Sequence, residues 1–192
     1  MRTPSSRRGR SDRDGRPAGR VQVPAEKRRR TGGSERSSEV VRQTLESYAK
    51  RGIFRAYGEQ PCEGGQSQFS FRWHMDATFH VAYSPSRLEL LFSDVLPKIP
   101  SRSSMYRALR AFVEAHTSPT LPEHRRTDPR KVGVTVTNRH GMVSLVVALK
   151  DAHLEYGVRK AVNLIHELFV EFLRNPAYFD YMVEHFQVDP DM

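Results

Sequence analysis

The densest cluster of side chains that could do chemistry lies between Pro122 and Arg130. Three of these residues are arginines, whose planar guanidinium groups bind phosphate or carboxylate in a bidentate geometry, and His124 could serve as a proton donor. No serine or cysteine stands among them, so an enzyme here would need partners from distant parts of the chain. The alternative is a solvated loop in which Glu123 and Asp128 pair with neighbouring arginines. The residues predicted to bind an anion or a partner are His124, Arg125, Arg126, Asp128 and Arg130.

The other motifs in the sequence do not indicate catalysis or metal binding. His166 and Glu167 resemble the start of the helical zinc-protease motif, but Val170 stands where the second histidine is required. Cys62 is the only cysteine, which excludes an intramolecular disulfide and a cysteine-based zinc site. Neither a glycine-rich phosphate loop nor a G-x-S-x-G sequence occurs. We therefore predict a protein that is not an enzyme, with no catalytic residue, no metal and no cofactor.

A second group of candidate residues is basic and lies near the N-terminus. Residues 1–38 carry a net charge of +8 out of +9 for the whole chain, so the remainder is nearly neutral. Any electrostatic attraction to the phosphate groups of a nucleic acid would come mainly from this segment. Its affinity for them would be salt-sensitive and largely independent of sequence. The alternative is a passive, solubilising segment. The predicted phosphate-binding residues are Arg7, Arg8, Arg10, Lys27, Arg28, Arg29 and Arg30.

The same segment marks the predicted domain boundary. Residues 1–38 are rich in Arg, Ser, Gly and Pro and cannot bury enough apolar area to offset their conformational entropy. We therefore predict a disordered tail over residues 1–38 and a single domain over residues 39–192. No apolar stretch approaches the length of a membrane-spanning helix, and the N-terminus lacks the apolar core of a secretory signal. A cytoplasmic protein without a membrane partner is the expectation.

The elements that position these residues follow from hydrophobic periodicity. Apolar residues recur at helical spacing after Ser38, after Ser103 or Ser104, and through a long stripe from Val158 to Phe172. Apolar and polar residues alternate, as in half-buried strands, over residues 68–75, 78–83, 87–92, 132–136 and 143–149. The predicted fold is α+β, with an antiparallel five-stranded sheet packed by helices in the order α-β-β-β-α-β-β-α. A further helical stretch is expected after Pro176.

Large apolar side chains are concentrated near the C-terminus. They exceed what one helical face can bury, which indicates an interface with a second copy or with another protein. The predicted partner-binding residues are Phe169, Phe172, Tyr178, Phe179, Tyr181, Met182 and Phe186.

The element order resembles that of type III secretion chaperones and of the related YbjN-type family. The resemblance covers residues 39–187 by order and size and includes no signature motif. It implies an antiparallel sheet covered on one face by helices, dimerisation, and binding of a partner polypeptide without catalysis. Those chaperones are usually acidic, whereas this domain is nearly neutral and has a basic extension. We therefore predict a chaperone-like or adaptor protein-binding module that forms a homodimer. The alternatives are a nucleic-acid-associated protein that uses its tail, and a small-ligand binder or enzyme at residues 122–130.

Overall fold

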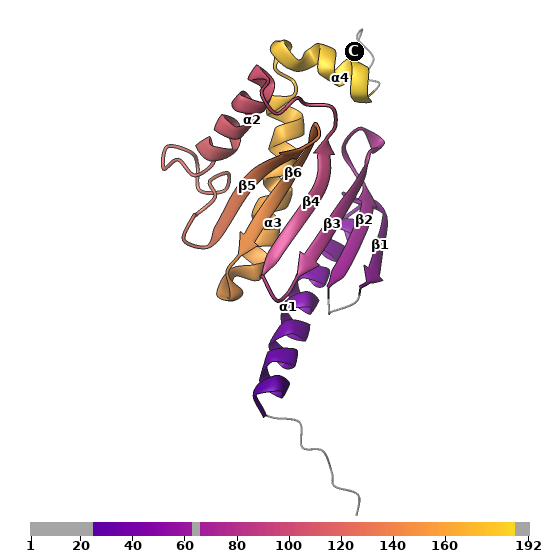
Figure 1. Ribbon diagram of the computed structural model, residues 1–192, viewed down its shortest axis with the longest axis vertical. Helices are drawn as coiled ribbons and strands as arrows, with labels where there is room; N and C mark the ends of the chain where they lie inside the picture. The colour runs from indigo at the N-terminus through magenta and orange to yellow at the C-terminus, as the bar shows by residue number, and fades with distance from the viewer. Residues whose placement is uncertain (1–24, 63–65, 187–192) are drawn as a thin grey trace, which may run out of the picture.

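A six-stranded antiparallel sheet forms the centre of the molecule (Figure 1). The computed structural model describes residues 25–62 and 66–186. The strands run in the spatial order β1-β2-β3-β4-β6-β5. Their bounds are β1 Arg55–Pro61, β2 Ser67–Arg72, β3 Thr78–Ser84, β4 Glu89–Leu96, β5 Val132–Arg139 and β6 Met142–Leu149. The prediction of an α+β fold with an antiparallel sheet packed by helices is confirmed.

The prediction of five strands is wrong, because β1 precedes the predicted three-stranded meander and adds an edge strand. Its sequence lacks the alternation of apolar residues, and it contains Gly58 and Pro61, both of which disfavour a strand. Pairing with β2 nevertheless forms, with a register shift between Arg55 and Gly58. Proline is tolerated there because an edge strand leaves one side of its backbone unpaired. The element order is therefore α-β-β-β-β-α-β-β-α, followed by a further helix.

The first helix begins earlier than its periodicity predicts. Helix α1 spans Ala25–Lys50, so Ser38 lies inside it and is not its N-cap. Tertiary packing begins near this point, since Ser37, Val41 and Leu45 are all buried. The predicted disordered tail therefore overlaps a helix over residues 25–38, and residues 1–24 lie outside the described part of the chain.

The remaining helices follow the predicted stripes. Helix α2 spans Ser104–Ala115, and the Ser103 hydroxyl caps it by accepting a hydrogen bond from the Tyr106 N–H at 3.1 Å. Helix α3 spans Leu154–Glu167 and continues as a wider π-turn over Leu168–Phe172. The last helix, α4, spans Phe179–Phe186. Short 3-10 turns occupy His74–Asp76, Asp151–His153 and Pro176–Tyr178. No helix within residues 25–62 and 66–186 has both the length and the apolar character needed to cross a membrane.

The core lies between one face of the sheet and helices α1 and α3, which stand behind the strands in Figure 1. Every second residue along these strands points into the core. Examples are Phe69, Phe71, Tyr83 and Phe92, all of them almost fully buried. Gly157 lets α3 approach β6 closely, because a Cβ there would come within 2.3 Å of a Leu149 methyl carbon. The helices thus cover one face and leave the other open.

Candidate functional site

The loop that joins α2 to β5 is anchored to α3 through Glu167. Arg125 donates two hydrogen bonds to Glu167 Oε2, from Nε at 2.9 Å and from Nη2 at 2.7 Å, and it also pairs with Glu171. His116, which is 3% exposed, brings Nε2 to 2.8 Å from the same oxygen and Nδ1 to 2.8 Å from the Phe112 carbonyl. The side chains of His116, Arg125 and Glu167 thus form one hydrogen-bonded network.

Glu167 is held in its charged form by this network. Burial opposes ionisation, but the hydrogen bonds from Arg125 and His116 outweigh it, and the pKa of Glu167 lies below its ordinary value. A second anchor lies about two helical turns before Glu167 on α3. Lys160 is buried and donates from Nζ to the carbonyl oxygens of Glu123, at 3.0 Å, and His124, at 2.7 Å. The loop is thus fixed to α3 by charged side chains at two levels.

These contacts divide the predicted anion-binding residues of the loop. Arg125 faces Glu167 and Glu171, and Arg130 forms an ion pair with Asp128 at 3.0 Å. Hydrogen bonds from the side chain and the backbone N–H of Arg130 lower the pKa of Asp128 to about 2. Arg126 lines a shallow hollow with Asp128 and Arg130, while His124 is exposed and contributes its carbonyl oxygen to Lys160. The loop is therefore organised mainly as a structural clamp.

The C-terminal aromatic residues lie mostly inside the chain. Phe169, Phe172 and Met182 belong to the core, with exposures of 1%, 7% and 3%. Tyr178, Tyr181 and Phe186 are half-buried against that core, and the Tyr181 hydroxyl donates to the Pro97 carbonyl at 2.8 Å. Phe179 is the member of the group that is exposed, at 37%. Most of these side chains thus pack among the π-turn, α2 and α4, and their predicted role in binding a partner stays a prediction.

The structure describes only some of the basic residues that are predicted to bind phosphate. Arg7, Arg8 and Arg10 lie outside the described residues, whereas Lys27, Arg28, Arg29 and Arg30 lie within the first turns of α1. In Figure 1 this end of the helix extends past the edge of the sheet, away from α4.

The open face of the sheet carries an uncharged band that crosses all six strands. The strand register aligns its side chains in two rows. The second row, Gln60, Gln68, Ala82, Leu91, Val146 and Thr135, is paired across all six strands. The first row pairs Gly58, Ser70, His80 and Ser93 over β1 to β4, and Ser144 and Thr137 over β6 and β5, on either side of the register shift between β4 and β6. Charged residues such as Arg72, Glu89 and Arg139 lie at the margins. A chain with 28% charged residues therefore presents a broad surface with none.

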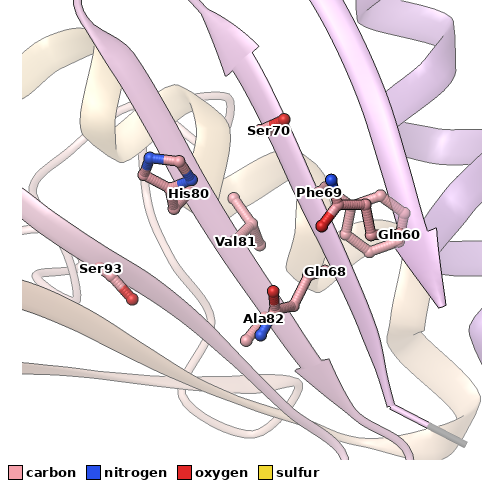
Figure 2. Close-up of a pocket in the computed structure, with 8 residues that line it drawn as sticks. All are labelled: Gln60, Gln68, Phe69, Ser70, His80, Val81, Ala82 and Ser93. Carbon is pink, nitrogen blue, oxygen red and sulfur yellow. The ribbon is translucent and has the colours of Figure 1, made fainter. Parts of the chain in front are cut away.

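A hollow of about 300 Å³ lies within this band, over β1 to β4 (Figure 2). Its polar lining consists of Gln60, Gln68, Ser70, His80 and Ser93, and Ala82 forms part of its floor. Hydrogen bonds from these five polar side chains to other described residues are absent, so their amide, hydroxyl and imidazole groups are free to bind something else.

Sequence reasoning did not identify this surface. The alternation predicted that Ser70 and Arg72 face away from the core, but the partners of Ser70 across β1, β3 and β4 depend on the register. One signal was available: the outward positions of several predicted strands are occupied by small or uncharged residues rather than by Lys or Glu.

His80 is the only titratable side chain in the two rows of the band. His80 faces Ser70 and Ser93 across its two neighbouring strands, yet no carboxylate orients it and neither hydroxyl is hydrogen-bonded to it.

A pair of histidines lies outside the band. His166 Nδ1 lies 3.3 Å from His74 Nε2. Burial and the electrostatic effect of His166 lower the pKa of His74 to about 4. Within residues 25–62 and 66–186 no three His, Cys, Asp or Glu side chains are grouped to hold a metal ion.

Comparisons of the chain with protein-family models, with curated proteins and with solved structures found no match. The open face must therefore be interpreted from its own geometry.

Proposed function

We propose that this protein is a non-enzymatic protein-binding module that holds a segment of polypeptide against the open face of its sheet. The observation that carries the proposal is the uncharged band with its free amide, hydroxyl and imidazole groups. The centres of protein interfaces are depleted of charged residues, because a charge covered by a partner loses its hydration. Side-chain amides and hydroxyls can replace water at the N–H and C=O groups of a bound backbone.

The resemblance to the secretion chaperones supports the same class of function. It implies a sheet covered by helices on one face and a polypeptide partner. The additional edge strand β1 is a departure from their element order. It widens the open face, since Gly58 and Gln60 extend both rows of the band.

Replacing Ala82 with arginine tests the proposal. Ala82 lies between Gln68 and Leu91, its neighbours across the two adjacent strands, so a long charged side chain there would obstruct the hollow. We expect peptides selected on the wild-type protein from a phage-displayed random library to bind Ala82→Arg at least about tenfold more weakly. Fluorescence anisotropy of labelled synthetic copies measures the affinity.

The matched control is Ala111→Arg, on the exposed surface of α2, which should bind these peptides as the wild type does. Equal binding by Ala82→Arg, or failure of the wild type to enrich any peptide, would overturn the proposal. Light scattering during gel filtration tests whether the occupant of the face is a second copy of the chain. A wild-type dimer that becomes monomeric in Ala82→Arg would show that a second copy covers the face.

A second function, binding to nucleic acid, is favoured by the position of the basic residues of α1. Lys27, Arg28, Arg29 and Arg30 lie on the part of the helix that extends past the sheet, where a long polyanion has access (Figure 1). We propose that these residues bind phosphate groups without sequence preference. Because Ser37 is buried, deletion of residues 1–38 would disturb the domain, and substitution is the better test.

Changing all four basic residues to glutamine should weaken retention on double-stranded DNA at low salt. The slope of log affinity against log salt should fall by about 3 to 4, since each lost phosphate contact contributes about 0.9. Salt-dependent filter binding measures the slope. Changing four exposed arginines of the domain, Arg51, Arg87, Arg102 and Arg110, provides the control and should alter the slope little. An equal loss in both variants would refute a role for α1.

A further inference from the structure

A second hollow lies beside the first, because Phe79 and Asp94, which line it, are the chain neighbours of His80 and Ser93, which line the first. It reaches α4 through His185 and Phe186, and the two hollows together are called the groove below. The volume of the second hollow is about 320 Å³, and its apolar walls include Met75, Phe79, Val95, Pro97 and Phe186. The register places His80 opposite Ser93 in the first hollow, and Thr78 and Asp94 follow along the same strands in the second. Because strands rise about 3.3 Å per residue, an extended segment of about five residues would span both hollows.

Asp94 lines the second hollow and directly follows Ser93, which lines the first. The ladder between β4 and β6 shifts register between Phe92 and Leu96, and Asp94 has a φ of 51° within this bulge. Bulges redirect side chains, and left-handed backbone at a residue other than glycine is a strained state often found at binding sites. The Asp94 N–H donates to the Ser144 hydroxyl at 3.1 Å, while its carboxylate has no ion-pair or hydrogen-bond partner among the described residues.

The surroundings of Asp94 do not supply a cation. Asp76, at the neighbouring turn, already pairs with both Arg55 and Arg72. His185 lines the far side of the hollow, is almost fully buried, and lies 3.7 Å from Glu184. A segment that covered Asp94 without bringing a positive charge would leave a desolvated, unpaired carboxylate, which is strongly unfavourable.

Resting on the binding function proposed above, we propose that the groove holds an extended segment of a partner polypeptide in which an apolar residue stands beside an arginine or lysine. The apolar side chain enters the second hollow beneath Met75, and the cationic group pairs with Asp94. Met75 suits this position because it is flexible and polarisable, and it is 41% exposed. The amides and hydroxyls of the first hollow bind the adjoining backbone.

The composition of selected peptides tests this inference. Peptides enriched from the random library on the wild-type protein should share a basic residue adjacent to a large apolar one. Labelled copies should bind Asp94→Asn about fivefold more weakly, with a smaller dependence on salt. Met75→Ser, which removes the apolar rim at an exposed position, should also weaken binding. The control is Asp180→Asn, since Asp180 is an exposed acid of α4 outside the hollow, and its affinity should equal that of the wild type.

Two outcomes would overturn the basic–apolar specificity alone. Peptides that bind the wild type, are lost on Ala82→Arg and bind Asp94→Asn unchanged would overturn the basic–apolar specificity and leave the binding function standing. Enriched peptides without a shared basic residue would have the same consequence. Failure to enrich any peptide would overturn both proposals. Thermal unfolding of each variant verifies that the groove substitutions leave the fold intact.

Discussion

Replacing Phe169 with alanine should lower the free energy of unfolding by about 4 kcal/mol. The ring is 1% exposed and lies where the π-turn meets the sheet and α4. Its centroid stands 4.7 Å from His74, 5.8 Å from Phe79 and 5.5 Å from Phe186. Truncation would leave a cavity bounded by three elements that cannot close over it independently. Equilibrium unfolding in urea measures the loss.

The matched control is Phe179→Ala, a residue from the same aromatic group that is 37% exposed. We expect its free energy of unfolding to stay within about 0.5 kcal/mol of the wild type, as for most surface substitutions. The comparison distinguishes a core from an interface. If Phe169→Ala cost less than about 1 kcal/mol while abolishing binding of a partner, the aromatic group would be the interaction surface and the buried arrangement would be refuted.

Replacing Glu167 with alanine should destabilise the protein by about 3 kcal/mol, at the lower end for disruption of a buried ion pair. The side chain of Glu167 is 13% exposed, and its Oε2 atom accepts hydrogen bonds from Arg125. The same oxygen lies 2.8 Å from Nε2 of the buried His116. Removal of the carboxylate leaves Arg125 paired with Glu171 alone and leaves the buried Nε2 atom of His116 without its partner. The control is Glu155→Gln, whose partner Arg159 lies on an exposed turn of α3, and its effect should stay below about 0.5 kcal/mol. A loss of similar size in both variants would contradict the clamp.

The same carboxylate gives the stability a defined pH dependence. The folded state lowers the pKa of Glu167 below its ordinary value of 4.5, so its contribution is fully present above pH 4.5. The contribution is lost as pH falls through the lower pKa of the folded state. The free energy of unfolding of the wild type should therefore fall more steeply with acidification than that of Glu167→Gln. Parallel profiles from urea titrations across this range would show that Glu167 is not the responsible group.

The clamp and the hollow of Figure 2 lie on opposite sides of the sheet. Glu167 belongs to α3, behind the strands in Figure 1, whereas Ala82 lines the hollow on the open face. We therefore expect Glu167→Ala to change stability and Ala82→Arg to change binding. Thermal unfolding of both variants tests this separation.

The sequence by itself determined the fold class and most of the elements. Alternation such as Phe69, Phe71 in β2 and Val143, Leu145 in β6 reports a strand with one buried face, because successive side chains point to opposite sides. Strand β1 lacked this signal, since a bulged edge strand that contains glycine and proline owes its pairing to β2 rather than to its own pattern. The early start of α1 was missed for a related reason, because residues 25–36 have no apolar periodicity.

Tertiary structure alone decided which polar residues are engaged and which are free. His116 and Arg125 meet Glu167 across separations of 51 and 42 residues, and His80 meets Ser93 only through the register of β3 and β4. The sequence placed Arg125 and Arg126 side by side as equal candidates, yet the docking of the loop on α3 turned Arg125 toward two carboxylates. The burial of most C-terminal aromatic side chains also depends on tertiary structure, because α4 packs against the π-turn. The local sequence pattern determines on which face of a helix or strand a side chain lies. The contacts of that side chain depend on how separate helices and strands pack together.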